Sequence, residues 1–195
     1  MMTPELEKKA LRASAKERRA SAHAKHGDVA GEQLASISLD FCGAKPTVVV
    51  SGFSAIGDEI DVRPLMLALH SQGFQLALPV IAGKGQPLVM RAWKPGDSVA
   101  EKTWGIAEPL DSAPEVEPDI LLVPLLAFDG DGYRLGYGGG FYDRTLAKLK
   151  ARKSVIAVGV AYDEQRVDVV PREGYDEPCD WILTPSGPKR CKSSE

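Results

Sequence analysis

The chain has 195 residues, 44% hydrophobic and 26% charged, a composition typical of one globular domain with a sizeable core. Its net charge of −3 at pH 7 argues against nucleic-acid binding, because proteins that bind nucleic acid usually carry a basic surface. Three widely spaced cysteines fit a reducing cytoplasm better than a disulfide framework or a zinc site. No export signal is visible, and the longest apolar run, 120–128, is too short to span a bilayer. We therefore expect a cytoplasmic protein without membrane contact.

The N-terminal region predicts two helices. Residues 3–5 (Thr-Pro-Glu) form a typical helix start, with a capping hydroxyl, a proline in the first turn and an acid at the positive end of the helix dipole. We expect this helix to end near Lys25 and its many basic side chains to form a solvent-exposed face. A second helix is expected from about residue 28, with an apolar stripe formed by Leu34, Ile37 and Phe41.

Short apolar runs then alternate with helical segments. The runs predict strands over 47–51, 74–81, 88–93, 119–124, 155–161 and 181–184, and helical patterns occur around 62–69 and 140–150. The strand over 88–93 is expected to be antiparallel or peripheral, because it follows a short Gly/Pro turn. Residues 94–118 read as a long surface loop pinned by Trp104. We expect a single domain over 1–185 and a disordered tail over 186–195.

This order of elements predicts an α/β three-layer sandwich with a mainly parallel, Rossmann-like sheet. The run at 119–124 lacks alternation, which indicates a strand buried on both faces. Ligands of such sheets bind beyond the carboxyl ends of the strands. The loops expected at that edge are 51–59, 124–140 and 161–166.

A glycine-rich segment is the strongest functional signal in the chain. Residues 134–144 read Arg-Leu-Gly-Tyr-Gly-Gly-Gly-Phe-Tyr-Asp-Arg and lie between a predicted strand and a helix. Such a loop presents backbone N–H groups at a helix N-terminus, which suits a phosphate, and Asp143 is placed to hold the magnesium that accompanies a nucleotide. The spacing matches neither a Walker A motif nor the dinucleotide fingerprint. A tight structural turn is the alternative, but the flanking charged and aromatic residues favour a ligand site.

The same string, preceded by Val-Pro-x-x-Ala-Phe-Asp, closely resembles the signature of the 5-formyltetrahydrofolate cyclo-ligase (5,10-methenyltetrahydrofolate synthetase) family. Weaker similarities follow the family order over about 8–185: Lys8-x-x-Leu11-Arg12, the loop 57–61, the segment 102–109 and the segment 176–183. The resemblance implies conversion of 5-formyltetrahydrofolate to 5,10-methenyltetrahydrofolate, with ATP as co-substrate, Mg²⁺ as cofactor, and ADP and phosphate released.

The resemblance also implies the roles of individual residues. ATP would contact Lys8, Arg12, Arg134, Leu135, Gly136, Tyr137, Gly138, Gly139, Gly140, Phe141 and Tyr142. The folate would contact Ser54, Glu59, Trp104, Tyr137, Gly138, Gly139, Gly140 and Phe141. Magnesium would bind Asp143, with Asp180 as a second acidic partner.

One position departs from the family pattern. Many members that the chain resembles have a lysine between the last two loop glycines, where this chain has Gly139. Arg134 and Arg144 are the nearby candidates to supply the missing charge. Two alternatives stay open: a paralogue that uses the same ATP site on another substrate, and a non-catalytic folate-binding module. The expected partners are 5-formyltetrahydrofolate and ATP, in a monomer or weak dimer.

Overall fold

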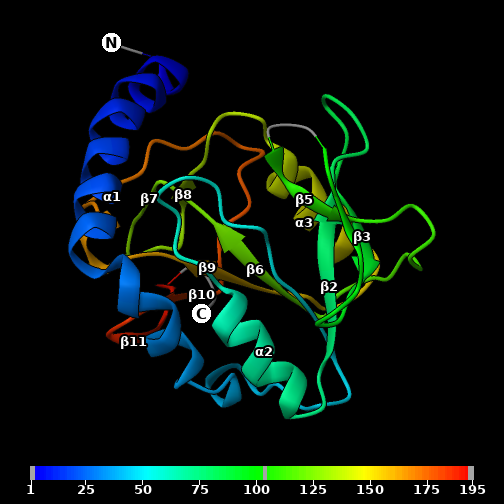
Figure 1. Cartoon of the computed structure of the whole chain (residues 1–195). Coiled ribbons are helices and arrows are strands. Elements are labelled where there is room, and N and C mark those ends of the chain that lie inside the picture. The colour runs from blue at the N-terminus through cyan, green and yellow to red at the C-terminus, as the bar shows by residue number, and fades with distance from the viewer. Residues whose placement is uncertain (1–2, 103–104, 193–195) are drawn as a thin grey trace.

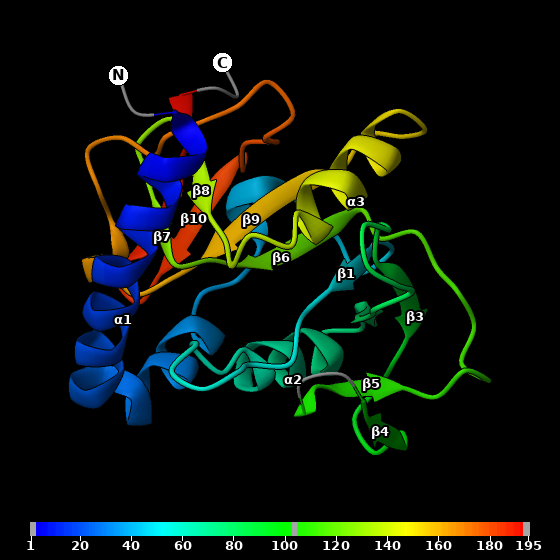
Figure 2. The same ribbon diagram turned by 90° about the horizontal axis from the view of Figure 1, so that it is seen from above.

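The protein is built around a seven-stranded sheet covered by helices on both faces (Figures 1 and 2). The computed structural model describes residues 3–102 and 105–192. The sheet has the order β11-β10-β9-β6-β1-β2-β3. Its strands are β1 (Val49–Ser51), β2 (Gln75–Val80), β3 (Val89–Ala92), β6 (Ile120–Pro124), β9 (Ile156–Val160), β10 (Trp181–Thr184) and β11 (Gly187–Arg190).

The sheet is mainly parallel, as the sequence predicts. Strands β2, β1, β6, β9 and β10 are parallel neighbours, whereas β3 and β11 pair antiparallel at the two edges. Helix α2 (Arg63–Ser71) covers one face and α3 (Phe141–Lys150) the other (Figure 2). The three-layer α/β class is therefore confirmed, and the peripheral antiparallel position of β3 is also confirmed.

Strand β6 lies at the centre of the sheet and is buried on both faces. Ile120 and Leu122 pack into the core that contains α2, while Leu121 and Val123 pack into the core that contains α3. Successive side chains of a strand point to opposite faces, so an unbroken apolar run serves both cores. The carboxyl ends of β1, β6, β9 and β10 consequently meet along one edge of the sheet.

Helix α1 (Pro4–Ala35) is one long helix and not the two that the sequence predicts. Thr3 caps it, and its Oγ1 accepts a hydrogen bond from the Leu6 N–H. The helix continues through Gly27 because its second half packs against α2. At Gly31 a Cβ would lie 2.7 Å from the Asp61 carbonyl oxygen, so only glycine permits this approach. Among the described residues, no helix is long and apolar enough to cross a membrane.

Two small hairpins lie in segments that the sequence predicts as loops. Strands β4 (Val99–Glu101) and β5 (Ala107–Pro109) form one of them, inside the predicted loop 94–118. The buried carboxylate of Glu108 accepts a 3.0 Å hydrogen bond from the Ile81 N–H and holds β5 beside the end of β2. Strands β7 (Ala127–Phe128) and β8 (Arg134–Leu135) form the second hairpin, which leads directly into the glycine loop.

The prediction of a disordered tail over 186–195 is wrong as far as residue 192. Strand β11 pairs with β10 from Trp181↔Arg190 to Thr184↔Gly187. Gly187 makes the turn with φ of +115°, and Cys191 is buried in the α3-side core. The segment is polar because it is an edge strand, where basic side chains and a proline also discourage pairing with other chains. Residues 193–195 lie outside the described residues.

Deleting residues 187–195 should destabilise the protein. The deletion removes the ladder with β10 and the buried Cys191 side chain, a loss of about 2 kcal/mol or more. We expect thermal unfolding to show a Tm lower by roughly 5 °C or more. Deleting only 193–195 is the control and should leave Tm unchanged; equal Tm values for both deletions would contradict the role of β11.

Candidate active site

The glycine loop connects β8 to the N-terminus of α3. Gly138 and Gly140 have φ values of +97° and +62°, in the left-handed region that side chains disfavour, and Gly140 is the N-cap of α3. No hydrogen bond to another described residue uses the N–H groups of residues 136–140 as donors. The N–H groups of residues 136–140 therefore form a cluster of donors without a partner among the described residues, next to the N-terminus of α3, which is the arrangement that binds a phosphate.

Two arginines hold the loop by its carbonyl groups. Arg12 Nε of α1 donates to the Gly136 carbonyl oxygen at 2.9 Å, and Arg144 Nη2 of α3 donates to the Gly139 carbonyl oxygen. The Arg144 guanidinium also lies over the Phe141 ring, 5.5 Å from its centroid. With carbonyls engaged by guanidinium groups, the peptide planes are fixed and positive charge surrounds the loop.

The inner face of α1 carries cationic side chains into the protein. Lys8, Arg12 and Arg19 share one face with the buried Ala15 and Ala22, at spacings of four, three or seven residues. Lys9 and Lys16 lie outside this face and are exposed. The prediction of a solvent-exposed basic face is therefore wrong for the inner residues and holds for the outer ones.

Lys8 is buried against the segment that precedes β10. Its Nζ lies 2.6 Å from Asp176 Oδ2 and 2.9 Å from Glu173 Oε2. Burial alone would lower the pKa of Lys8, but the hydrogen bonds and charges of the two carboxylates raise it. The structure thus pairs Lys8 with carboxylates, whereas Arg12 bonds the backbone of the glycine loop.

Arg19 joins the glycine loop to the loop after β1. Its side chain is 4% exposed, and its donors reach Asp58 Oδ1, Glu59 Oε1 and the Tyr137 hydroxyl. Glu59 and Tyr137, both predicted folate contacts, are therefore brought together. Arg19 was not among the predicted site residues, because it stands beside Arg18 in a run of basic residues that was expected to be exposed. Its helical spacing with Ala15 and Ala22 is the signal that separates it from the exposed residues.

The folate side of the predicted site includes Ser54 and the β4–β5 hairpin. Ser54 Oγ donates to the Ala107 carbonyl oxygen at 2.8 Å, so the loop after β1 and the start of β5 are adjacent. Ser54 and Glu59 belong to the same loop, as predicted. Trp104 lies outside the described residues.

Asp143 and Asp180, the predicted magnesium ligands, have different partners. Asp143 Oδ1 lies 2.8 Å from Arg134 Nη2 and accepts the Glu177 N–H at 3.1 Å. Asp180 Oδ2 accepts the N–H of Ala157 at 2.8 Å, near the start of β9. No group of three or more His, Cys, Asp or Glu side chains gathers as a metal cluster in the part of the chain that the structure describes.

The carboxylates of Asp143 and Asp180 both lie close enough to Cys179 for their charges to act on its thiol. Burial raises the pKa of the Cys179 thiol; Arg134 opposes this, while the charges of Asp180 and Asp143 raise it further. A magnesium ion on a nucleotide takes most of its ligands from phosphates and water, with one or two carboxylates. The residues present therefore fit a metal carried by ATP better than a metal held by protein alone.

The other residues predicted to contact ATP differ in whether their side chains are available to a ligand. Leu135 is buried with Leu126 and Val170, so its side chain is not available to a ligand. Phe141 and Tyr142 are partly buried against the α3-side core. The Arg134 guanidinium is engaged by Asp143 and the Glu177 carbonyl oxygen, which leaves Arg144 as the arginine beside the last loop glycines.

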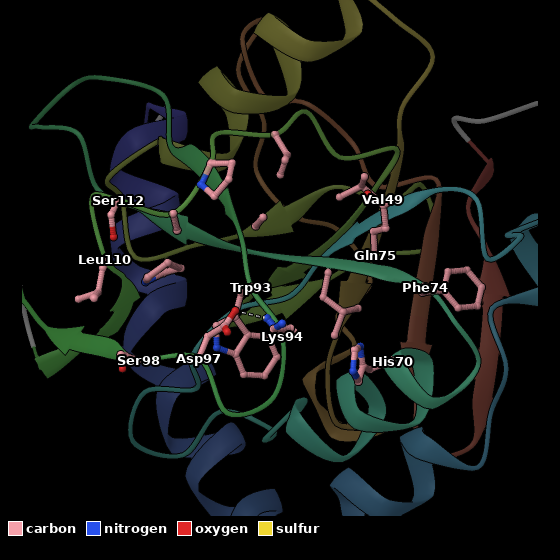
Figure 3. A pocket seen from close by; sticks show the side chains of 16 residues that line it. Val49, His70, Phe74, Gln75, Trp93, Lys94, Asp97, Ser98, Leu110 and Ser112 are labelled. Atoms are coloured by element: carbon pink, nitrogen blue, oxygen red, sulfur yellow. Dashed lines mark hydrogen bonds between the residues drawn. The ribbon is translucent and has the colours of Figure 1, made fainter.

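A cavity of about 620 Å³ lies elsewhere (Figure 3). It is lined by Val49 and Gln75, the first residues of β1 and β2, so it opens at the amino edge of these strands. Trp93 also lines it, beside the Lys94 N–H that donates to Asp97 Oδ2 at 2.9 Å. None of the described residues predicted to bind ATP or folate lines this cavity.

Comparison with known proteins identifies the family of the chain. The model of the 5-formyltetrahydrofolate cyclo-ligase family matches residues 4–185. The chain belongs to this family. It is 35% identical over 164 residues to 5-formyltetrahydrofolate cyclo-ligase from Escherichia coli, which covers 80% of this chain and 88% of the relative. It is 41% identical over 131 residues to the Haemophilus influenzae protein of the same name, which covers 64% and 69%.

A solved structure has the same fold. The 5,10-methenyltetrahydrofolate synthetase of Aquifex aeolicus matches with a TM-score of 0.76 and 27% identity over 95% of this chain and 93% of that one. The family resemblance drawn from the glycine-loop string is therefore confirmed.

Replacing Gly138 by alanine should weaken ATP binding. The substitution is strained at φ of +97°, and the new Cβ would lie 3.3 Å from the Arg12 guanidinium. We expect the Kd for ATP, measured by calorimetry, to rise at least about tenfold, equivalent to about 1.4 kcal/mol. Gly136→Ala is the matched control, because a Cβ there meets open space, and it should have a much smaller effect. Similar Kd values for both variants would argue against the loop conformation as the basis of binding.

Proposed function

We propose that this chain converts 5-formyltetrahydrofolate to 5,10-methenyltetrahydrofolate with ATP and Mg²⁺, releasing ADP and phosphate. One observation carries the proposal: unpaired N–H donors of the glycine loop lie at the N-terminus of α3, next to the Arg19 cluster that includes Glu59. Membership of the cyclo-ligase family supports the reaction class. Tyr137 of the glycine loop and the buried Glu59 share Arg19, so a phosphate bound by the loop and a folate bound at Glu59 would lie side by side. Such an arrangement suits two substrates that must react with each other.

The reaction activates an amide and then closes a ring. The N5-formyl oxygen attacks the γ-phosphorus of ATP, the bond to ADP breaks, and an iminium-like formyl phosphate forms. N10 then attacks the formyl carbon, phosphate leaves with the former formyl oxygen, and N10 loses its proton. The substrate oxygen is itself the nucleophile toward phosphorus, so the protein has to position the substrates and neutralise charge.

The cysteines fit a reaction that needs no protein nucleophile. Burial raises the pKa of Cys179, and burial with neighbouring negative charges raises the pKa of Cys191 to about 12. Cys42 is half-buried, and burial raises its pKa as well. Thiols with raised pKa values are poor nucleophiles at neutral pH.

Charge neutralisation falls to the loop donors and the flanking arginines. Arg144 lies over Phe141 and bonds Gly139, which supports it as the cation that replaces the family's loop lysine. At Gly139 a Cβ would lie 2.7 Å from the Phe141 ring, so a lysine there would require the ring to move. We infer that glycine at 139 and the Arg144–Phe141 contact belong together. Preorganised donors and cations of this kind stabilise the charge that develops in phosphoryl transfer.

Magnesium would be held by Asp143 together with the phosphates. Bound there, the ion would neutralise charge on the β- and γ-phosphates. Asp143 keeps its orientation through Arg134 and the Glu177 N–H. Asp180 directly precedes β10, next to Cys179 in the chain, and would act on the metal through a bridging water.

Two alternatives give different results in solution. A paralogue that acts on another molecule, which Gly139 alone motivates, would bind ATP without turning over folate. A non-catalytic folate-binding module would bind 5-formyltetrahydrofolate with an affinity indifferent to ATP and magnesium. The unpaired donors of the glycine loop argue against the second, because a passive folate binder has no need of a triphosphate site.

The direct test is ATP-dependent formation of the methenyl product. Purified protein with 5-formyltetrahydrofolate, ATP and magnesium should show a rising absorbance of 5,10-methenyltetrahydrofolate, and omission of ATP should abolish the rise. ADP should accumulate in equal amounts. A flat trace from folded protein would overturn the proposal, and nucleotide binding would then distinguish the two alternatives.

Asp143→Asn should impair the magnesium-dependent step. The amide oxygen can still accept from Arg134 and from the Glu177 N–H, but the charge for the cation is lost. We expect kcat to fall at least about 100-fold and the magnesium concentration for half-maximal rate to rise. Asp180→Asn is the comparison, with a smaller effect on magnesium dependence. An unchanged magnesium titration of Asp143→Asn would remove this residue from the metal site.

A further inference from the structure

The least expected group in the site is the buried guanidinium of Arg19. It belongs to α1, yet it donates to acceptors from two other segments. Nε lies 2.9 Å from Asp58 Oδ1, Nη1 lies 3.5 Å from Glu59 Oε1, and Nη2 reaches both Asp58 and the Tyr137 hydroxyl. A planar fork with fixed donor directions can hold several acceptors at once, which a lysine cannot do.

Stability alone is a weak explanation for this cluster. Removing charges from water is costly, and well-packed apolar side chains often stabilise a fold as well as a buried ion pair does. The guanidinium nevertheless contacts two residues that the site requires. Tyr137 lies between two loop glycines and is half exposed, and Arg19 contacts it twice, through a hydrogen bond to its hydroxyl and with the guanidinium 5.4 Å from the ring centroid.

We propose that Arg19 is a positioning residue that holds the Glu59 carboxylate in register with Tyr137, so that the folate and nucleotide sides form one site. This inference rests on the proposed function. The pteridine ring of the substrate presents N–H donors on its amide and amino groups. A carboxylate can accept two such donors side by side, whereas a protonated carboxyl cannot.

The groups around Glu59 make Arg19 the source of positive charge. Glu59 faces Arg19 of α1, Asp58 of its own loop, Tyr137 of the glycine loop and Tyr142 of α3. Burial raises the pKa of Glu59, while the Ile56 N–H and the charge of Arg19 lower it. Without Arg19 the pKa rises further. Binding that needs the carboxylate is then weakened at low pH and recovers as the pH rises through the raised pKa.

The test is the pH dependence of folate binding. The Kd for 5-formyltetrahydrofolate is measured by calorimetry between about pH 6 and pH 9 for wild type, Arg19→Gln and Arg19→Lys, with the Kd for ATP measured in parallel. For Arg19→Gln we expect a folate Kd at least tenfold higher at the acid end of this range that returns toward wild type as the pH rises. Arg19→Lys should remove this pH dependence but bind folate more weakly than wild type at every pH, because the fork is lost.

Arg18→Gln is the matched control. It removes a positive charge one residue away on the same helix, where Arg18 donates to the Arg166 carbonyl oxygen at 3.3 Å and not to Glu59. This variant should keep the wild-type folate Kd and its pH profile. A similar shift in Arg18→Gln would mean that net charge and not the Arg19 cluster is responsible.

The outcomes separate this inference from the proposed function. Wild-type protein that neither binds nor converts 5-formyltetrahydrofolate refutes both. Suppose instead that the wild type is active, and that Arg19→Gln weakens folate binding and ATP binding equally, with an unchanged pH profile and a lower Tm. This result refutes the inference about Arg19 and leaves the proposed function intact. If Arg19→Gln does not fold, Arg19→Lys decides, and an unchanged folate Kd in that variant overturns the inference.

Discussion

The site depends on the contact between the inner face of α1 and the loops at the carboxyl ends of the strands. Three cations of that face are buried or partly buried, and their oxygen acceptors lie on three segments. Lys8 contacts 173–176, Arg12 and Arg19 both contact the glycine loop, and Arg19 also contacts the loop after β1. A buried charge without a partner is strongly destabilising, so the helix has one rotation and one height that satisfy all three. The packing of Gly31 on Asp61 and Pro64 holds the other end of the helix in the same register.

The sheet fixes the positions of the loops that α1 contacts. The parallel order β2-β1-β6-β9-β10 brings the loops after β1 and β6 to one edge, and the core on both faces of β6 holds these strands rigidly. The chemistry is then placed on loops, where backbone N–H groups are free to bind a ligand. Arginines bond two carbonyl groups of the glycine loop and give it a defined shape without closing it.

Local sequence patterns predicted the fold correctly, and the ligand roles of the site residues stay predictions. The unbroken apolar run of β6 and the glycines before α3 are local signals, so the burial of this strand and the start of this helix followed from the sequence. The length of α1 did not, because the local cost of Gly27 is outweighed by packing on α2, which the sequence does not display. Arg19 and Lys8 looked like solvated charges, since their acceptors are far along the chain. The polar strand β11 was missed because its partner, and not its own composition, makes it a strand.

The distances along the chain between α1 and its acceptors bear on how the protein is made. Lys8 pairs with residues 165 and 168 positions later, and Arg12 bonds a carbonyl group 124 positions later. On the ribosome, α1 leaves the exit tunnel long before any of these acceptors has been synthesised. The contacts of Lys8 and Arg12 can therefore form only after most of the chain has been synthesised. A nascent chain shorter than 136 residues therefore carries α1 without the oxygen acceptors that Lys8 and Arg12 have in the complete fold.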